Sequence, residues 1–145
     1  MDVSNNTFFI ENKEAYVSFE TAKLLQKWGF DWFTYYSYEE YDGKVSIRLT
    51  TGEDTGRPTY AAPTQQMACR WLRENRYVTI AVIPYEISPG RMEYVYKIWI
   101  KENEKTFRFF AQGRAKEYKD QTQEEVTEAA ILYCLKEYLE LSGVD

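Results

Sequence analysis

Apolar and polar positions in the middle of the chain predict a helix followed at once by a strand. Met67, Trp71 and Leu72 recur at helical spacing and form one apolar stripe. Thr64 stands just before this stripe, where its side chain can cap the first turn. Residues 78–83 are mostly apolar and rich in β-branched side chains, which is typical of a buried strand. We therefore expect Trp71 and Leu72 to be buried in the core.

The remaining segments predict further helices and strands, several with recognisable ends. One helix begins after Ser18 and ends at Gly29, and the last helix begins with a capping box of Thr122 and Glu125. The other expected elements are a hairpin over 30–49 turning at Asp42-Gly43, a loop over 50–61, strands over 92–101 and 106–111, and the last helix over 122–141. This order, α-β-β-α-β-β-β-α, predicts an α+β fold with one mainly antiparallel sheet and helices packed chiefly on one face. Residues 1–145 are expected to form a single domain, with residues 1–16 as a loose N-terminal arm or short edge strand.

The apolar arc of the last helix is wider than one sheet face can cover. Leu132, Leu135 and Leu139 extend this arc to one side. An uncovered strip of this kind is seldom left exposed in a monomer, so we expect it to join two copies in a homodimer. The alternative is that the first helix covers the strip within one chain.

Charge is unevenly distributed along the chain, whose net charge is −5. Residues 62–119 carry 11 Lys/Arg against 6 Asp/Glu, whereas both flanking segments are acidic. Basic side chains here alternate with rings, and we expect Trp99 and Phe110 to project among the lysines and arginines of the sheet. Such a pattern predicts an anion-binding or single-stranded nucleic-acid-binding face. Its members are Arg70, Arg73, Arg76, Lys97, Trp99, Lys101 and Arg108. The alternative is that these charges pair with acidic groups within the fold.

The residue types present give little support for catalysis. The chain has no histidine, and its two cysteines, Cys69 and Cys134, lack metal-ligand spacing. It also lacks a glycine-rich phosphate loop. Glu39, Glu40 and Asp42 could hold a hard cation, but a turn that keeps its charges in water is the simpler interpretation. We therefore expect no catalytic residues, no cofactor and no bound metal.

The sequence shows no sign of a signal peptide or of a membrane-spanning segment. The first residues, MDVSNNTFF, show no basic region followed by an apolar run, and no apolar segment is long enough to cross a bilayer. Reduced thiols fit the same setting, so we expect a cytoplasmic protein that does not bind a membrane.

Three stretches carry a resemblance to a known family: SFETAKLLQKWGF, APTQQMACRWLRE and EEVTEAAILYCLKEYL. They resemble a small uncharacterised family that is common in Bacteroidetes genomes and their prophages. This resemblance implies a phage or mobile-element cargo protein and brings no catalytic residues with it. The leading hypothesis is thus a non-enzymatic accessory protein that binds an unidentified protein partner. The alternative hypothesis is a single-stranded nucleic-acid-binding module that uses the basic middle region.

Overall fold

A computed structural model of the chain describes residues 8–10, 14–53, 55–115 and 121–142. The chain divides into two compact units, Met1–Met67 and Ala68–Val144, and the boundary falls inside helix α2 (Gln65–Asn75). The fold class is α+β, and the predicted order of the main helices and strands is confirmed. The prediction of one domain over residues 1–145 stays a prediction. Every strand pairing described is antiparallel, but the strands are divided among three sheets rather than gathered in one.

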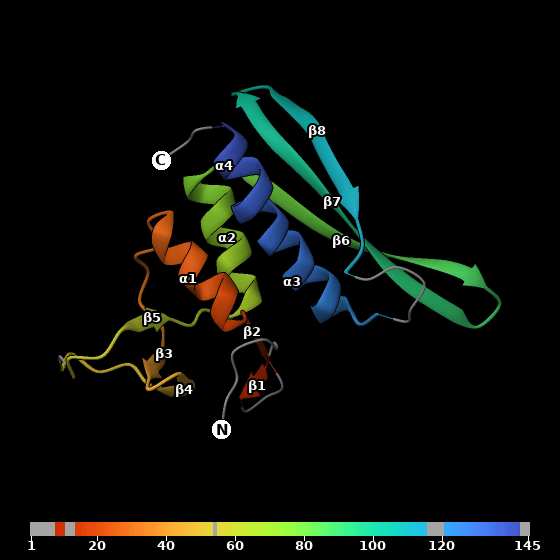
Figure 1. The fold of residues 1–145 in the computed structure, drawn as a ribbon. Helices are drawn as coiled ribbons and strands as arrows, with labels where there is room; N and C mark the ends of the chain where they lie inside the picture. The colour runs from red at the N-terminus through yellow and green to blue at the C-terminus, as the bar shows by residue number, and fades with distance from the viewer. Residues whose placement is uncertain (1–7, 11–13, 54, 116–120, 143–145) are drawn as a thin grey trace. The chain divides into compact units, whose positions relative to one another are not determined.

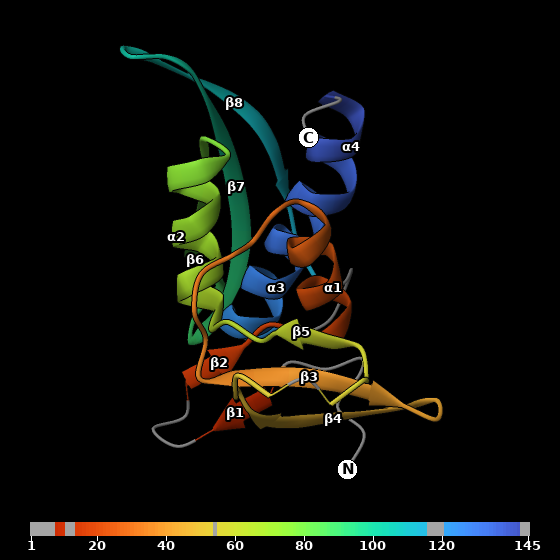
Figure 2. The same ribbon diagram turned by 90° about the vertical axis from the view of Figure 1, so that its left-hand side faces the viewer.

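The first unit contains helix α1 (Phe19–Lys27) and a small sheet with strand order β4-β3-β5 (Figure 2). The Ser18 hydroxyl accepts a hydrogen bond from the Thr21 backbone N–H, which confirms the predicted cap. After the helix, Gly29 has a φ of 99°, a value that favours glycine. Strands β3 (Tyr36–Tyr41) and β4 (Lys44–Leu49) are joined by Asp42 and Gly43, both with positive φ, as the predicted two-residue turn requires.

Two short features of this unit differ from the expectation. Strand β5 (Thr59–Ala61) pairs with the free edge of β3, so the end of the predicted loop over 50–61 is a strand. Strands β1 (Phe8–Ile10) and β2 (Glu14–Tyr16) form an antiparallel pair within the segment expected to be a loose arm or edge strand. Short strands of this kind carry weak local signals because tertiary pairing decides whether they form.

Tyr38 forms the centre of the core in the first unit. Its side chain is fully buried, and its hydroxyl donates a hydrogen bond of 2.5 Å to the backbone oxygen of Val17. The ring of Phe19 meets the Tyr38 ring edge-on, with centroids 5.5 Å apart. These contacts connect β3 to the start of α1, so one strand residue joins the sheet and the helix of this unit.

The second unit is built on a sheet of three long strands with order β6-β7-β8. They are β6 (Val78–Ser88), β7 (Arg91–Asn103) and β8 (Thr106–Gly113), and they form the predicted antiparallel meander. Strands β6 and β7 continue past the end of β8 as a two-stranded ribbon (Figure 1). Trp71 and Leu72 on α2 are 2% and 0% exposed, which confirms their predicted burial.

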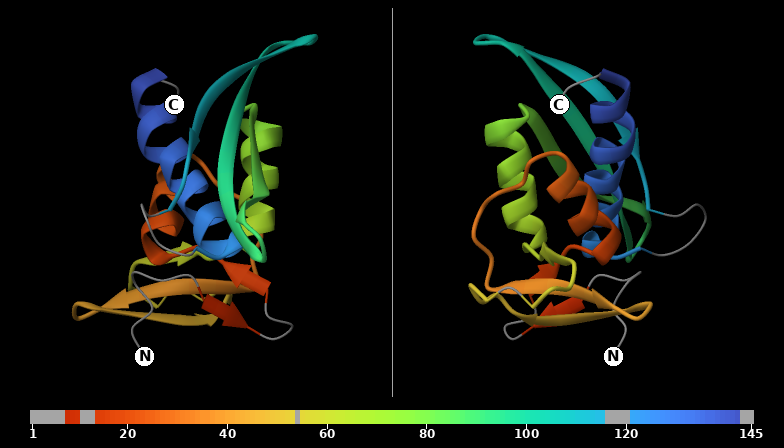
Figure 3. Two further views of the ribbon diagram at one scale, coloured as in Figure 1. Left: turned by 90° about the vertical axis from the view of Figure 1, so that its right-hand side faces the viewer. Right: turned by 60° about the vertical axis from the view of Figure 1, so that its left-hand side comes forward.

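The last helix runs through three consecutive segments, α3 (Gln123–Tyr133), a π-helical turn η1 (Cys134–Tyr138) and α4 (Leu139–Ser142), drawn as one helix in Figure 3. Thr122 and Glu125 make both hydrogen bonds of the predicted capping box. Leu135 and Leu139 are fully buried in the single chain, and Leu132 is half-buried. The predicted self-association strip over Leu132, Leu135 and Leu139 is therefore wrong as an exposed surface. The prediction fails because a wide apolar arc is equally typical of a helix that is buried within its own chain.

A candidate binding surface on the three-stranded sheet

The two faces of the β6-β7-β8 sheet have different surroundings. Alternate residues of β7, namely Tyr96, Ile98 and Ile100, are buried. They lie on the side against which α3 packs, and the Tyr96 and Tyr133 rings are 6.1 Å apart there. In Figure 1, α2 and α3 both lie on this side of β7 and β8. Among the described residues of this unit, no helix covers the opposite face, which we call the open face. Whether all helices of the chain share one side stays a prediction.

The open face carries a group of aromatic rings. Alternation along β7 places Trp99 on this face, and the strand register places Phe109 opposite Trp99 and Phe107 opposite Lys101. The Trp99 and Phe109 rings meet edge-on with centroids 5.9 Å apart. Phe107 and Phe109 are 58% and 51% exposed, a large fraction for phenylalanine. Large apolar side chains gathered on an uncovered sheet face mark a surface suited to binding.

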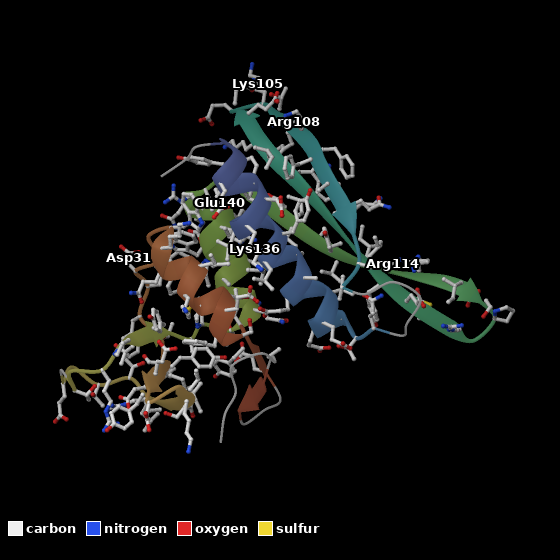
Figure 4. All side chains as sticks on the ribbon, viewed as in Figure 1. Asp31, Lys105, Arg108, Arg114, Lys136 and Glu140 are labelled. Atoms are coloured by element: carbon white, nitrogen blue, oxygen red, sulfur yellow. The ribbon has the colours of Figure 1, made fainter. Side chains whose placement is uncertain are left out.

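Basic side chains accompany these rings. Lys97 and Lys101 lie on the open face on either side of Trp99, and Lys101 is 3.9 Å from the exposed carboxylate of Glu104. Over residues 96–115 the chain has five Lys/Arg and two Asp/Glu, so this part is basic within an acidic protein. The other basic residues of this stretch are Lys105, Arg108 and Arg114, which are labelled along β8 in Figure 4. A ligand on the open face therefore meets both flat rings and positive charge.

The structure corrects part of the predicted basic face. Arg108 projects to the helix side of the sheet, where its Nε donates to Glu102 at 2.7 Å. Phe110 lies on that side too, and its ring is 5.0 Å from the Tyr138 ring. The register between β7 and β8 shifts between Ile98 and Trp99, which adds one residue to β8 and sets which phenylalanines face outward. Trp99 is therefore joined by Phe107 and Phe109 rather than by Phe110.

The three arginines of α2 stand apart from the open face. Arg70 and Glu74 form an ion pair of 2.6 Å along the helix surface. The guanidinium of Arg76 lies 5.8 Å from the centre of the Trp71 ring, and Arg73 is exposed. Of the seven residues predicted for an anion-binding face, the structure thus brings together Lys97, Trp99 and Lys101.

A second cluster of polar side chains lies near the beginning of β7, where β6 and β7 extend past the end of β8. The sequence analysis did not predict this cluster. Glu93 is 4% exposed, and its carboxylate accepts hydrogen bonds from Arg114 at 3.1 Å, the Tyr85 hydroxyl at 3.2 Å and Arg91 at 3.5 Å. The Arg114 guanidinium also lies over the Tyr85 ring, 5.4 Å from its centroid. Burial and the hydrogen bond to Glu93 both raise the pKa of Tyr85. We call these four residues the Glu93 cluster. The only sign of this cluster in the sequence is a glutamate, Glu93, within a predicted strand, at the position that pairs with Tyr85.

A comparable arrangement surrounds Glu39 in the first unit. Its carboxylate accepts hydrogen bonds from Arg48 at 2.5 Å and Arg57 at 3.1 Å, and Arg57 also lies 3.9 Å from the centre of the Tyr41 ring. The hydrogen bonds from the two arginines lower the pKa of Glu39. The expectation that the acidic groups of this turn stay in water is therefore wrong for Glu39, which is 7% exposed. Its partners are arginines: Arg48 lies on the neighbouring strand β4, and Arg57 lies just before β5, so Glu39 joins these two segments to β3.

The two thiols are poorly suited to nucleophilic chemistry. Burial raises the pKa of the Cys69 thiol to about 12, and it raises the pKa of Cys134 as well. Among the described residues, no group of three or more His, Cys, Asp and Glu side chains is placed to hold a metal ion. In the same residues, no helix combines the length and apolar character needed to cross a membrane.

Comparison with known proteins does not extend these observations. No protein-family model, no curated protein and no solved structure matches the chain. The resemblance to a Bacteroidetes and prophage family therefore stays a prediction.

Proposed function

We propose that this chain is a non-enzymatic binding protein and that its open face binds single-stranded nucleic acid. The observation that supports the proposal is the grouping of Trp99, Phe107 and Phe109 with Lys97 and Lys101 on an uncovered sheet face. Single-strand binders combine rings on which bases stack with cations that contact the backbone. Each stacked base contributes about 1–3 kcal/mol to such binding.

The spacing of these groups fits an extended strand. Lys97 and Lys101 are four residues apart on β7, which is about 13 Å at the rise of a β-strand. Trp99 lies between them, so a base stacked on its ring leaves phosphates on both sides within reach of a lysine. A duplex hides the faces of its bases inside the stack, and we therefore expect single strands to bind much more tightly than duplexes.

The leading hypothesis from the sequence, a cytoplasmic accessory protein of phage or mobile-element origin with a protein partner, also remains a proposal. Exposed rings serve protein interfaces as well as nucleic acids. Lysines are depleted at the centre of protein interfaces, however, and here they alternate with the rings. Because the net charge of the chain is negative, we do not expect a general affinity for polyanions. We expect binding at one local, positively charged site.

Fluorescence anisotropy with labelled oligothymidylate tests this proposal. We expect binding that weakens with salt, to which the two lysines contribute a slope of log K against log salt of about −1.4. Replacing both Lys97→Gln and Lys101→Gln should remove that contribution, and Trp99→Leu should weaken binding at every salt concentration.

The matched control is Arg108→Gln, which removes one positive charge from the helix side of the same sheet. The proposal predicts nearly unchanged binding for this variant. It is wrong if the wild type binds no oligonucleotide at low salt, or if the Arg108 variant loses as much affinity as the lysine double variant. A partner protein that requires Trp99 and Phe109 would then become the preferred interpretation.

A further inference from the structure

The Glu93 cluster belongs to the same side of β7 as the rings and lysines of the open face. Residues 93, 95, 97, 99 and 101 alternate along one strand and therefore share a face. The pairing of β6 with β7 is regular from Val78 to Tyr85, so Tyr85 lies opposite Glu93 on that face. Arg114 follows the end of β8 and contacts both residues. A ligand that follows β7 from Lys101 past Lys97 consequently arrives at this cluster.

The cluster presents positive charge to solvent although a carboxylate lies at its centre. Glu93 is almost fully buried, whereas the Arg114 and Arg91 side chains are 41% and 53% exposed. Two guanidinium groups share one carboxylate, which leaves a net charge of +1. Glu93 and the Tyr85 ring restrict where Arg114 can lie. An arginine held in this way loses little conformational freedom when it binds an anion.

From these contacts, and on the basis of the function proposed above, we infer that Arg114 is a third phosphate-binding residue of the single-strand site, beside Lys97 and Lys101. Glu93 and Tyr85 act as positioning residues for its guanidinium group. The surface from Lys101 to Glu93 spans eight strand residues, or about 26 Å, twice the distance between the two lysines. A strand whose base stacks on Trp99 between the two lysines therefore contacts Arg114 only when it is long enough to extend past Lys97, and the site distinguishes long single strands from short ones.

The test compares the binding affinities of the wild-type chain and an Arg114→Gln variant. Each protein is measured with two labelled oligothymidylates, one of about four and one of about twelve nucleotides. With three phosphate contacts, a fourfold rise in salt should weaken the long oligonucleotide about 18-fold for the wild type. For the variant, which keeps two contacts, the same rise should weaken it about 7-fold. The short oligonucleotide should bind both proteins alike. Arg114→Lys keeps the charge and should restore the salt dependence of the long oligonucleotide.

The outcomes separate this inference from the proposed function. If Arg114→Gln leaves the long oligonucleotide unaffected, or weakens both lengths equally, Arg114 is not a length-dependent contact and the inference is wrong. Effects of Lys97 and Trp99 substitutions would still support the open face in that case. If the wild type binds neither oligonucleotide, the proposed function fails, and the inference fails with it. Circular dichroism of each variant shows whether the fold is kept, and Arg114→Lys provides the second variant should Arg114→Gln unfold.

Discussion

Substitution of Leu135 by glutamate distinguishes a core helix from a dimer-forming helix. Leu135 has no exposed surface in the single chain, and Leu139, four residues later, is equally buried. Removing a buried leucine side chain typically costs about 2–5 kcal/mol. Placing an unpaired carboxylate in the same space adds several kcal/mol, because the charge loses its hydration.

The sum of these costs is comparable to the whole free energy of unfolding of a typical domain, about 5–15 kcal/mol. We therefore expect Leu135→Glu to be largely unfolded at neutral pH, with lost near-ultraviolet circular dichroism and no cooperative thermal transition. Lys136→Glu is the matched control, because it introduces the same side chain at the neighbouring exposed position. That control should stay folded.

Sedimentation velocity supplies the result that would refute this reasoning. A Leu135→Glu protein that keeps its circular dichroism spectrum while its mass falls from dimer to monomer would show that Leu135 lies at an interface between copies. In that case the side chain of Leu135 would not belong to the core of the single chain, and the prediction of a self-association strip would be correct.

Two further predictions concern stability. Because hydrogen bonds from the arginines lower its pKa in the folded state below the ordinary value of 4.5, Glu39 stabilises the fold above that value, and this contribution is lost as the pH falls through the folded-state pKa. The difference in urea midpoint between wild type and Glu39→Gln should therefore be constant near neutral pH and shrink in acid; a difference that grows in acid contradicts the assignment. Gly113→Ala should lower the free energy of unfolding by about 1–3 kcal/mol, because the new Cβ would lie 2.5 Å from the hydroxyl oxygen of the buried Tyr96. Gly52→Ala, with open space around it, should be nearly neutral in the same denaturation experiment.

Local sequence determined the helices, their ends and the main strands of this protein. Ser18, the Thr122–Glu125 capping box and the Asp42-Gly43 turn were all correctly placed, because each acts through hydrogen bonds or dihedral angles within a few residues. The same holds for the buried stripe of α2 and the alternation along β7. For the candidate site, this alternation was enough to place Lys97, Trp99 and Lys101 on one face.

Contacts between distant segments decided the rest. A one-residue shift between β7 and β8 turns Phe109 toward Trp99 and sends Phe110 and Arg108 to the helix side, and strand alternation alone does not reveal such a shift. Burial of Leu135 depends on what surrounds the last helix, which its apolar arc does not specify. Glu93 meets Arg114 across 21 residues of sequence. Residues so far apart become neighbours only when the sheet forms, so the tertiary structure alone reveals the Glu93 cluster.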